Sequence, residues 1–405
     1  MRIPYRSLTF WIFAGLFSGI VCGRIFGEQI LPLADPLSEI FLRLLRMAIM
    51  PLIVASLTSA VISVGEKKNL GLLGIRTFLY YILTSLLAIL TGQILVNAFQ
   101  PGVGSSIRLS SKVAEIPVTQ QGIGEILLRI IPENPFRALA DGQVLPVIFF
   151  CLLFGFFVAR LKGPEKQLLS NFFHAAFQAL MQLTRLVIWT APIGVFGINA
   201  KIAATTGLEA FQSLGFYFIL VLAGLAIHGF VTLPLLLWLI TRRNPADHYR
   251  GMPPALVTAF STCSTIVTLP LTMEAVTRNS KVSTKVSSFV LPIGATVNMD
   301  GTALYECVAV IFIAQVYGFH LTLEQQMIVV LTALLASIGA ASVPMSGMVM
   351  MSIILGAVGL PLEGVGLILA VDRILDMFRT TVNVLSDSCG AVIIAHLEGE
   401  EVLPS

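Results

Sequence analysis

Charged residues are scarce in this chain, since only 12% of its 405 residues are Asp, Glu, Lys or Arg. A water-soluble domain usually carries about twice that fraction. The 22 acidic and 25 basic residues nearly balance, so the basic footprint typical of a nucleic-acid-binding protein is also missing. Hydrophobic residues make up 56% instead. This composition predicts an all-α polytopic protein that has the lipid bilayer as its main partner.

Cysteine pairs and catalytic motifs are missing as well. The 5 cysteines lie far apart, without CxxC spacing or a histidine at metal-ligand distance, so they predict neither a disulfide framework nor a metal site. None of the 5 histidines lies in a motif with a nucleophilic serine. No Gly-x-Gly-Asp motif indicates an aspartyl protease either. The sequence therefore predicts that the protein is not an enzyme.

Long apolar stretches fill the first 250 residues, and a membrane-spanning helix takes roughly 20 such residues. They lie at about 8–23, 47–64, 78–99, 144–159, 172–202 and 216–240. Lys and Arg cluster at alternate connections, which predicts a cytoplasmic N-terminus. Arg2 and Arg6 precede the first stretch without a small-residue cleavage site, so we expect a retained helix rather than a cleaved signal peptide.

Two later segments are broken by polar residues and proline at apparent membrane depth. Residues 254–276 lie between basic clusters and are expected to enter and leave the membrane from the cytoplasm, whereas residues 327–360 should dip in from outside. Each precedes one long helix, at 287–316 and 365–394. Such a unit, repeated with opposite insertion, is the inverted repeat of secondary transporters. Ordinary helices kinked by proline are the alternative interpretation.

The last of these helices carries a stripe of polar residues. At about 100° per residue, one set falls within an arc of about 80°: Asp372, Asp376, Arg379, Asn383 and Asp387. A charged side chain at the bilayer centre costs at least about 2.5–3.5 kcal/mol, so the stripe predicts a functional site. A structural ladder of salt bridges is the alternative.

The preceding helix contains Gly294, Asn298, Asp300 and Gly301, which predict local unwinding and free backbone carbonyls. Carboxylate, amide and carbonyl oxygens suit a hard cation such as Na⁺.

The charges of these two helices do not balance. Asp300 and the three aspartates of the stripe oppose only Arg373 and Arg379. A dry site with surplus carboxylates must recruit cations or protons. An anionic substrate would enter only together with them, which predicts cation-coupled uptake. A passive channel lined by the same stripe is the alternative of another class.

Three motifs in these segments resemble the glutamate transporter family, the dicarboxylate/amino acid:cation symporters. They are Asn298-Met-Asp-Gly-Thr-Ala-Leu-Tyr-Glu306, Ser337-Ile-Gly with Val343-Pro344, and Asp376-Met-Phe-Arg-Thr-Thr-Val-Asn383-Val-Leu-Ser-Asp387. The resemblance covers essentially the whole chain. It implies eight transmembrane helices plus two re-entrant helical hairpins, and import of glutamate or aspartate by alternating access.

The resemblance also implies a division of the chain into a scaffold and a transport domain. Residues 1–76 would form scaffold helices 1 and 2, residues 77–100 helix 3 of the transport domain, and residues 101–206 an extracellular loop with scaffold helices 4 and 5. Residues 207–250 would form helix 6 of the transport domain, and residues 251–400 its core. A homotrimer in the plasma membrane (the inner membrane of a bacterium), with both termini cytoplasmic, follows from the same likeness.

By this resemblance Asp376 binds the substrate ammonium and Arg379 its side-chain carboxylate, which suits a planar guanidinium. The other implied substrate contacts are Thr380, Asn383, Thr302, Ser264, Val343 and Gly347. Three sodium sites are implied. The first uses Gly294, Asn298, Asn383 and Asp387, the second Tyr81, Thr84, Ser85, Asn298 and Asp300, and the third Thr296, Ser337 and Ile338. Without the resemblance, Tyr81, Thr84 and Ser85 are interhelical hydrogen-bonding residues.

The chain departs from the family pattern at both hairpin tips. Cys263 and Ile266 stand where the family has a serine run, and Ser342 and Met345 where relatives often have glycine. Glu306 occupies a position that is Gln in archaeal relatives and Glu in animal transporters, which implies that H⁺ accompanies Na⁺.

Several points of substrate and coupling stay open at this stage. They are the preference between glutamate and aspartate, the number of Na⁺ ions and the return of K⁺ on the empty carrier. A C4-dicarboxylate or a neutral amino acid is the alternative substrate. Asp376 argues against the first, because a dicarboxylate has no ammonium, and Arg379 argues against the second.

Overall fold

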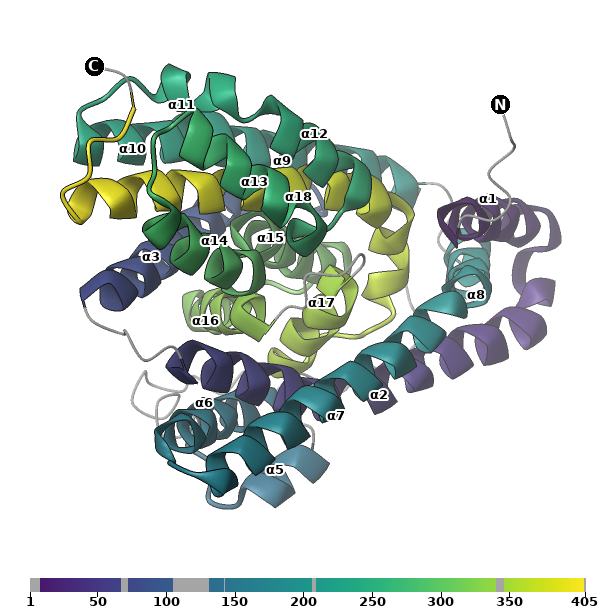
Figure 1. Ribbon diagram of the computed structural model, residues 1–405. Coiled ribbons are helices and arrows are strands. Elements are labelled where there is room, and N and C mark those ends of the chain that lie inside the picture. The colour runs from purple at the N-terminus through teal and green to yellow at the C-terminus, as the bar shows by residue number, and fades with distance from the viewer. Residues whose placement is uncertain are drawn as a thin grey trace.

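The computed structural model describes residues 8–66, 72–104, 131–141, 143–205, 209–339 and 346–403. All regular secondary structure in these ranges is helical (Figure 1). Five segments of the described chain are long and apolar enough to cross a bilayer, namely Phe10–Leu44, Leu72–Phe99, Ser213–Thr241, Thr284–Val316 and Val371–Leu397. An all-helical chain with several apolar spans is therefore confirmed, while eight transmembrane helices and two re-entrant hairpins stay a prediction.

One group of helices lies along one side of the molecule in Figure 1. It contains α1 (Leu8–Phe26), the turn η1 (Gly27–Ile30), α2 (Leu31–Glu66), α5 (Pro135–Ala140), α6 (Val144–Arg160), α7 (Pro164–Trp189) and α8 (Ala191–Thr205). Helices α6, α7 and α8 pack against α2, and α8 also packs along α1. A Cβ at Gly15, Gly19 or Gly23 of α1 would collide with the α8 backbone. Glycine at every fourth position therefore lets these two helices approach closely.

Two predicted spans in this group had the wrong bounds. The stretch at 172–202 is not one helix, because α7 ends at Trp189 and α8 begins at Ala191. Pro192 is the second residue of α8, where the first turn of a helix needs no backbone N–H donor, so it favours the start of a new helix at this point. The span predicted at 47–64 is part of the 36-residue helix α2, which runs through Pro36 and Pro51.

The second group is built around α14 (Thr284–Val297), α15 (Asp300–Val316) and α18 (Gly364–Leu397). Around them lie α3 (Leu72–Phe99), α9 (Glu209–Ile227), the π-turn η2 (His228–Thr232), α10 (Leu233–Thr241) and α11 (Pro245–Gly251). The most apolar windows of Thr284–Val316 and Val371–Leu397 are 100% and 83% buried, against 24–44% for the other long spans. These central helices are shielded from lipid, which is where ionisable residues are tolerated in a membrane protein.

Two helix pairs form at the segments predicted as hairpins. Helices α12 (Pro253–Thr262) and α13 (Thr265–Arg278) pack together, and so do α16 (Leu323–Gly339) and α17 (Ser346–Ala357). The first pair breaks at Cys263, whose φ of 51° is left-handed, and the Ser264 side chain then accepts the Val267 N–H at 3.3 Å. Helix pairs are thus confirmed, and insertion from a single membrane face stays a prediction.

The predicted unwinding of the helix before hairpin 2 is also confirmed. Helix α14 ends at Val297, and Asn298 and Met299 adopt non-helical backbone angles before α15 begins at Asp300. This break places polar side chains opposite the middle of α18, since both α14 and α15 pack against that helix.

Candidate functional site

The polar stripe of α18 faces the interior of the helical group. None of the five predicted stripe residues is more than 7% exposed: Asp372, Asp376, Arg379, Asn383 and Asp387. Helices α12, α14, α15 and α17 pack against α18. Ionisable groups from one helix therefore share one buried region with the α14–α15 break and both hairpins.

Arg379 lies among acidic and aromatic side chains in this buried region. Its Nη2 is 2.9 Å from Asp376 Oδ1 and 3.2 Å from Asp372 Oδ1. Its Cζ lies 3.9 Å from the centroid of the Tyr305 ring, and Arg373 adds a longer contact of 3.7 Å to Asp376. Two carboxylates and an aromatic face together stabilise a buried cation.

The rest of the guanidinium has unused hydrogen-bonding capacity. Arg379 Nε and Nη1 are buried and have no hydrogen-bond partner among the residues that the structure describes. A Cβ at Gly347, near the start of α17, would collide with Nη1. Nη1 therefore faces the second hairpin, where an anion would find a charged donor.

Other predicted substrate residues surround this position. Asn383 Oδ1 accepts the Gly301 N–H at 2.7 Å, and Asn383 Nδ2 donates to Thr302 Oγ1 at 3.2 Å. Thr380 and Ser264 are both buried. The hairpin that carries Ser264 packs on α18 at the same level, where the rings of Phe260 and Phe378 lie 5.1 Å apart, edge to face.

Three residues predicted near the second hairpin tip cannot be placed. Val343, Ser342 and Met345 lie outside the described residues.

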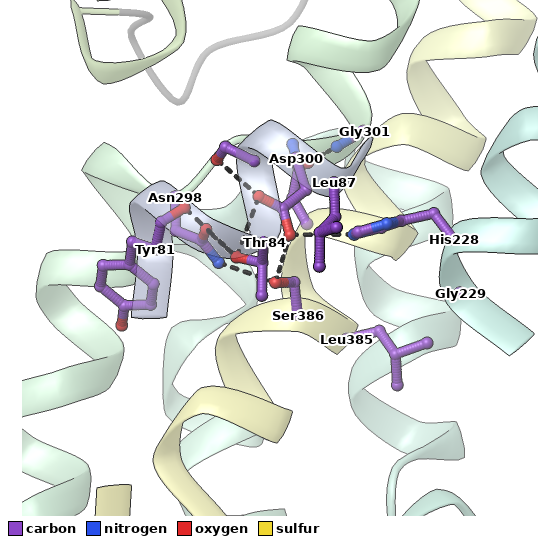
Figure 2. A network of polar contacts seen from close by, with 12 residues as sticks. Tyr81, Thr84, Leu87, His228, Gly229, Asn298, Asp300, Gly301, Leu385 and Ser386 are labelled. Atoms are coloured by element: carbon purple, nitrogen blue, oxygen red, sulfur yellow. Dashed lines mark hydrogen bonds and ion pairs between the residues drawn. The ribbon is translucent and has the colours of Figure 1, made fainter. Parts of the chain in front are cut away.

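A second cluster of oxygens forms around Asp300 (Figure 2). The Ser85 hydroxyl donates to Asp300 Oδ1 at 2.6 Å, and the Ser386 hydroxyl donates to Oδ2 at 2.6 Å. Thr84 Oγ1 lies 3.3 Å from Asp300 Oδ1 and 3.4 Å from Asn298 Oδ1. Four of the five residues predicted for one sodium site are thus brought together.

This cluster has more acceptors than protons. Thr84 Oγ1 lies 3.1–3.4 Å from four oxygens, two of them the backbone carbonyls of Tyr80 and Tyr81. A hydroxyl carries one proton and can satisfy only one of them well. Oxygens that outnumber the protons available to them favour a hard cation among them, so the residues present fit Na⁺.

The fifth residue of that predicted set points elsewhere. The Tyr81 hydroxyl donates to the Val290 carbonyl at 2.8 Å, and Figure 2 shows it directed away from Asp300. Among the contacts described for this cluster, Tyr81 contributes its backbone carbonyl, 3.3 Å from Thr84 Oγ1.

The residues of the first predicted sodium site are also adjacent. Asn298 Nδ2 donates to Asp387 Oδ1 at 2.9 Å and to Ser386 Oγ at 3.0 Å. A Cβ at Gly294 would lie 2.5 Å from Asp387 Oδ1, so only glycine lets the carboxylate approach this backbone. Asn298 and Ser386 join the Asp387 carboxyl to the Asp300 cluster.

The third predicted set is not joined by a hydrogen bond among the described residues. The Thr296 hydroxyl donates within α14, and the Ser337 hydroxyl donates to Leu334 within α16. The side chain of Ile338 lies outside the part of the chain that is described.

His228 is the main residue that the sequence analysis missed. It is fully buried in the π-turn η2, and its Nε2 lies 3.0 Å from Asp300 Oδ2. Figure 2 shows it reaching Asp300 from the side opposite Tyr81. An ionisable residue inside the apolar stretch at 216–240 was the available signal. Ser386 was missed because it lies beside the predicted stripe.

Glu306 lies one turn after Thr302 in α15. Its side chain is fully buried, and neither carboxyl oxygen has a hydrogen-bond partner among the described residues. An ionised carboxylate in such surroundings is costly.

Carboxylates alone do not form a metal site here. In the described part of the chain, no three His, Cys, Asp or Glu side chains gather closely enough to hold a metal ion. A bound cation would therefore also need hydroxyl, amide and backbone oxygens.

The sequence of this chain is similar to those of known membrane transporters. The family model described as the sodium:dicarboxylate symporter family matches residues 8–397. The chain belongs to this family. Known relatives are similar to this symporter along most of their own length. Excitatory amino acid transporter 3 of Mus musculus is 37% identical over 90% of this chain and 79% of its own.

Two further relatives cover still more of the symporter chain. An excitatory amino acid transporter of Caenorhabditis elegans is 36% identical over 98% of this chain and 90% of its own. The proton/sodium-glutamate symport protein of Geobacillus stearothermophilus is 35% identical over 97% and 95%. Family membership thus rests on nearly the entire sequence.

Proposed function

We propose that this symporter imports acidic amino acids together with Na⁺ by alternating access. The observation that carries the proposal is a buried Arg379 that lies beside Asp376 on one helix face and has two nitrogen positions without a partner among the described residues. An acidic amino acid offers a carboxylate to the first and an ammonium to the second. The names of the mouse and bacterial relatives support the same substrate class.

Substrate binding would exchange partners within one charge network. In the structure, Arg379 pairs with Asp376 at 2.9 Å and with Asp372 at 3.2 Å. A substrate side-chain carboxylate would take the guanidinium, and the substrate ammonium would take Asp376. The substrate's α-carboxylate has no partner in this exchange and adds a negative charge, so bound cations would have to offset it to limit the cost of desolvation.

Na⁺ would neutralise the two carboxylates that have no arginine. Thr84, Ser85 and Asn298 surround Asp300, and Gly294, Asn298 and Asn383 would serve the ion at Asp387. Asn383 Oδ1 also accepts from Gly301, next to Thr302. Cation binding would therefore order the same backbone that presents substrate contacts, which is a physical basis for coupling.

Thr296, Ser337 and Ile338 remain the candidates for a further ion. The break at Asn298 and the C-terminal end of α16 would have to close together to form this third position.

Alternating access is supported by how the two helix groups meet. The scaffold helices α2 and α6 contact the second hairpin, α16–α17, and α1 and α8 contact α18. The main contacts of α12 and α13 are with α11, α14, α18 and each other. Val257, Ile266 and Val267 on that first hairpin are exposed. In transport, residues 77–100 and 207–250 would move against the scaffold together with the core formed by residues 251–400.

Coupling to H⁺ would use Glu306. Its burial, with no donor in the part of the chain that the structure describes, supports a carboxyl that binds a proton before it moves through the membrane. We further propose a homotrimer in the plasma membrane, the inner membrane of a bacterium, with both termini in the cytoplasm. A C4-dicarboxylate or a neutral amino acid is the alternative cargo.

The decisive experiment is uptake of radiolabelled aspartate and glutamate into proteoliposomes with Na⁺, H⁺ and K⁺ gradients imposed separately. We expect saturable uptake that requires an inward Na⁺ gradient and exchange with unlabelled aspartate. Competition by succinate or alanine, measured in the same vesicles, separates the alternative substrates. Non-saturable flux that ignores the Na⁺ gradient would identify a channel instead.

A further inference from the structure

We infer that the short helix α11 positions the cation-binding groups from a distance, through the adjacent side chains of His248 and Tyr249. The inference rests on the proposed sodium sites. Helix α11 connects α10 to the first hairpin and begins at the cap residue Asn244, whose side chain accepts the Ala246 N–H at 3.0 Å. It supplies no predicted ligand of its own.

Tyr249 fixes the π-turn that carries His228. Its hydroxyl donates to the Gly229 carbonyl at 2.6 Å. In a π-turn the backbone bonding shifts from four to five residues, which is uncommon and needs support from its surroundings. Gly229 follows His228, whose Nε2 lies 3.0 Å from Asp300. The Tyr249 hydroxyl thus stabilises the backbone that aims the imidazole at the carboxylate.

His248 fixes α18 beside the second carboxylate. Its Nε2 lies 2.9 Å from Ser388 Oγ, and its Nδ1 lies 2.8 Å from Ser280 Oγ, at the end of hairpin 1. The Ser388 hydroxyl donates its one proton to the Leu385 carbonyl at 2.7 Å. His248 Nε2–H is therefore the donor to Ser388, and Ser280 donates to Nδ1.

Burial of this imidazole agrees with that assignment. The side chain is fully buried, and burial lowers the pKa of His248 to about 4. The ring is therefore neutral at neutral pH, with one donor and one acceptor nitrogen, and each has a serine partner.

The hydrogen bonds of Tyr249 and His248 lie on two sides of the hydrogen-bond network that joins Asp300 to Asp387. Ser386 donates to Asp300, Asn298 donates to Asp387, and Ser388 follows directly on α18. Helix α11 thus holds the π-turn on one side of Asp300 and residues 386–388 on the other. Loosening either attachment would displace oxygens that a cation needs in fixed positions.

Tyr249→Phe tests this directly, because it removes the hydroxyl and keeps the ring. We expect the Na⁺ concentration for half-maximal aspartate uptake to rise about three- to tenfold, the effect of losing one hydrogen bond. The maximal rate at saturating Na⁺ should stay within about twofold of the parent. Tyr317→Phe, at the end of α15, is the matched control and should leave the Na⁺ dependence unchanged.

An unchanged Na⁺ dependence in Tyr249→Phe, or a lower maximal rate at the parental Na⁺ dependence, would overturn the inference. Ser388→Ala, which removes the acceptor of His248, replaces Tyr249→Phe if that variant does not fold. A double variant with His228→Gln gives a further criterion. If Tyr249 acts through His228, the two shifts combine to less than their product, and full multiplicative effects contradict this route.

A binding assay without substrate separates this inference from the proposed function. The rise in thermal midpoint that Na⁺ gives the purified protein in detergent is measured for the parent, Asp387→Asn and Tyr249→Phe. If Asp387→Asn keeps the full rise, the proposed sodium site is wrong. If Asp387→Asn loses the rise and Tyr249→Phe keeps it at the parental Na⁺ concentration, only the role of α11 is wrong.

Discussion

The guanidinium of Arg379 is 1% exposed and depends on buried partners for its charge. In Arg379→Cys the carboxylates of Asp372 and Asp376 lose that partner, and an acidic substrate loses its charged donors. We expect aspartate uptake to fall at least about 100-fold, since removing one member of a buried ion pair costs about 3–5 kcal/mol. A neutral amino acid such as serine should compete better than in the parent.

Competition of radiolabelled uptake by unlabelled aspartate and serine measures this change. Arg278→Cys is the control, because Arg278 pairs with Glu274 on an exposed surface and its side chain is 76% exposed. Such a pair contributes little. Unchanged aspartate affinity in Arg379→Cys would remove Arg379 from the substrate site.

Neither carboxyl oxygen of Glu306 has a hydrogen-bond partner among the described residues. A proton bound there would therefore stay on Glu306 and cross the membrane with it. Glu306→Gln keeps the shape and abolishes titration. We expect Na⁺-driven uptake that no longer responds to an imposed pH gradient and no longer acidifies the vesicle lumen. A pH-sensitive dye inside the proteoliposomes reports this, and full parental H⁺ flux in the variant would refute H⁺ coupling through Glu306.

For single residues, the sequence predicted which side chains are buried better than the direction in which each side chain points. The arc of α18 was visible from its period alone, and its five members are all buried. The direction of the Tyr81 hydroxyl and the approach of His228 to Asp300 were not predictable. Both depend on how separate helices dock, which local sequence does not encode.

The close packing of α1 on α8 is a property of whole helices, and Gly19 tests it. A Cβ there would lie 2.6 Å from the Phe196 carbonyl oxygen. Gly19→Leu should destabilise the protein by about 1–3 kcal/mol through overpacking, seen as a lower thermal midpoint in detergent. Gly215→Leu is the control, since no atom lies within 4 Å of a Cβ at that glycine. Equal midpoints for the two variants would contradict the close contact.

The burial of the His248 imidazole in α11 predicts that the folded protein becomes less stable in mild acid. Burial lowers the pKa of His248 from its ordinary 6.5 to about 4. Below pH 6.5 the unfolded chain binds a proton that the folded chain refuses until about pH 4. Stability is therefore fully present above pH 6.5 and falls between pH 6.5 and 4. Thermal midpoints at pH 7.5, 5.5 and 4.5 should fall more steeply for the parent than for His248→Gln, and parallel curves would contradict this.

The sequence predicted those helix breaks that depend on residues at the break itself. Proline and serine runs predicted the two helix pairs, and glycines predicted the unwinding at Asn298. The π-turn at His228 and the division between α7 and α8 were not predicted. A π-turn has no composition of its own and forms where tertiary contacts such as that of Tyr249 stabilise it.

For the whole molecule, the exposed face of the first hairpin gives a topological prediction. Val267 on α13 is 60% exposed, whereas Val276 on the same helix is fully buried. Val267→Cys should react with a membrane-impermeant maleimide in inside-out vesicles and not in right-side-out vesicles. Val276→Cys should stay at the parental background on both sides, and equal labelling of Val267→Cys from both sides would contradict a cytoplasmic hairpin.

The composition predicted the all-helical membrane class because apolar length alone decides it. The number of membrane crossings is harder to predict, since several helices are shorter than a full span and hairpin helices have similar apolar length. The central helices α14, α15 and α18 are recognised by polar residues that lipid would not tolerate. Their burial in the structure has the same cause.

One amide serves both groups of oxygens. Asn298 directs its oxygen toward Thr84 and its nitrogen toward Asp387 and Ser386, so a single rotamer suits both neighbourhoods. An ion bound at either proposed site would favour the Asn298 orientation that the other site requires. We therefore expect the uptake rate to depend on Na⁺ concentration in a sigmoidal way, low at first and rising steeply over a narrow range.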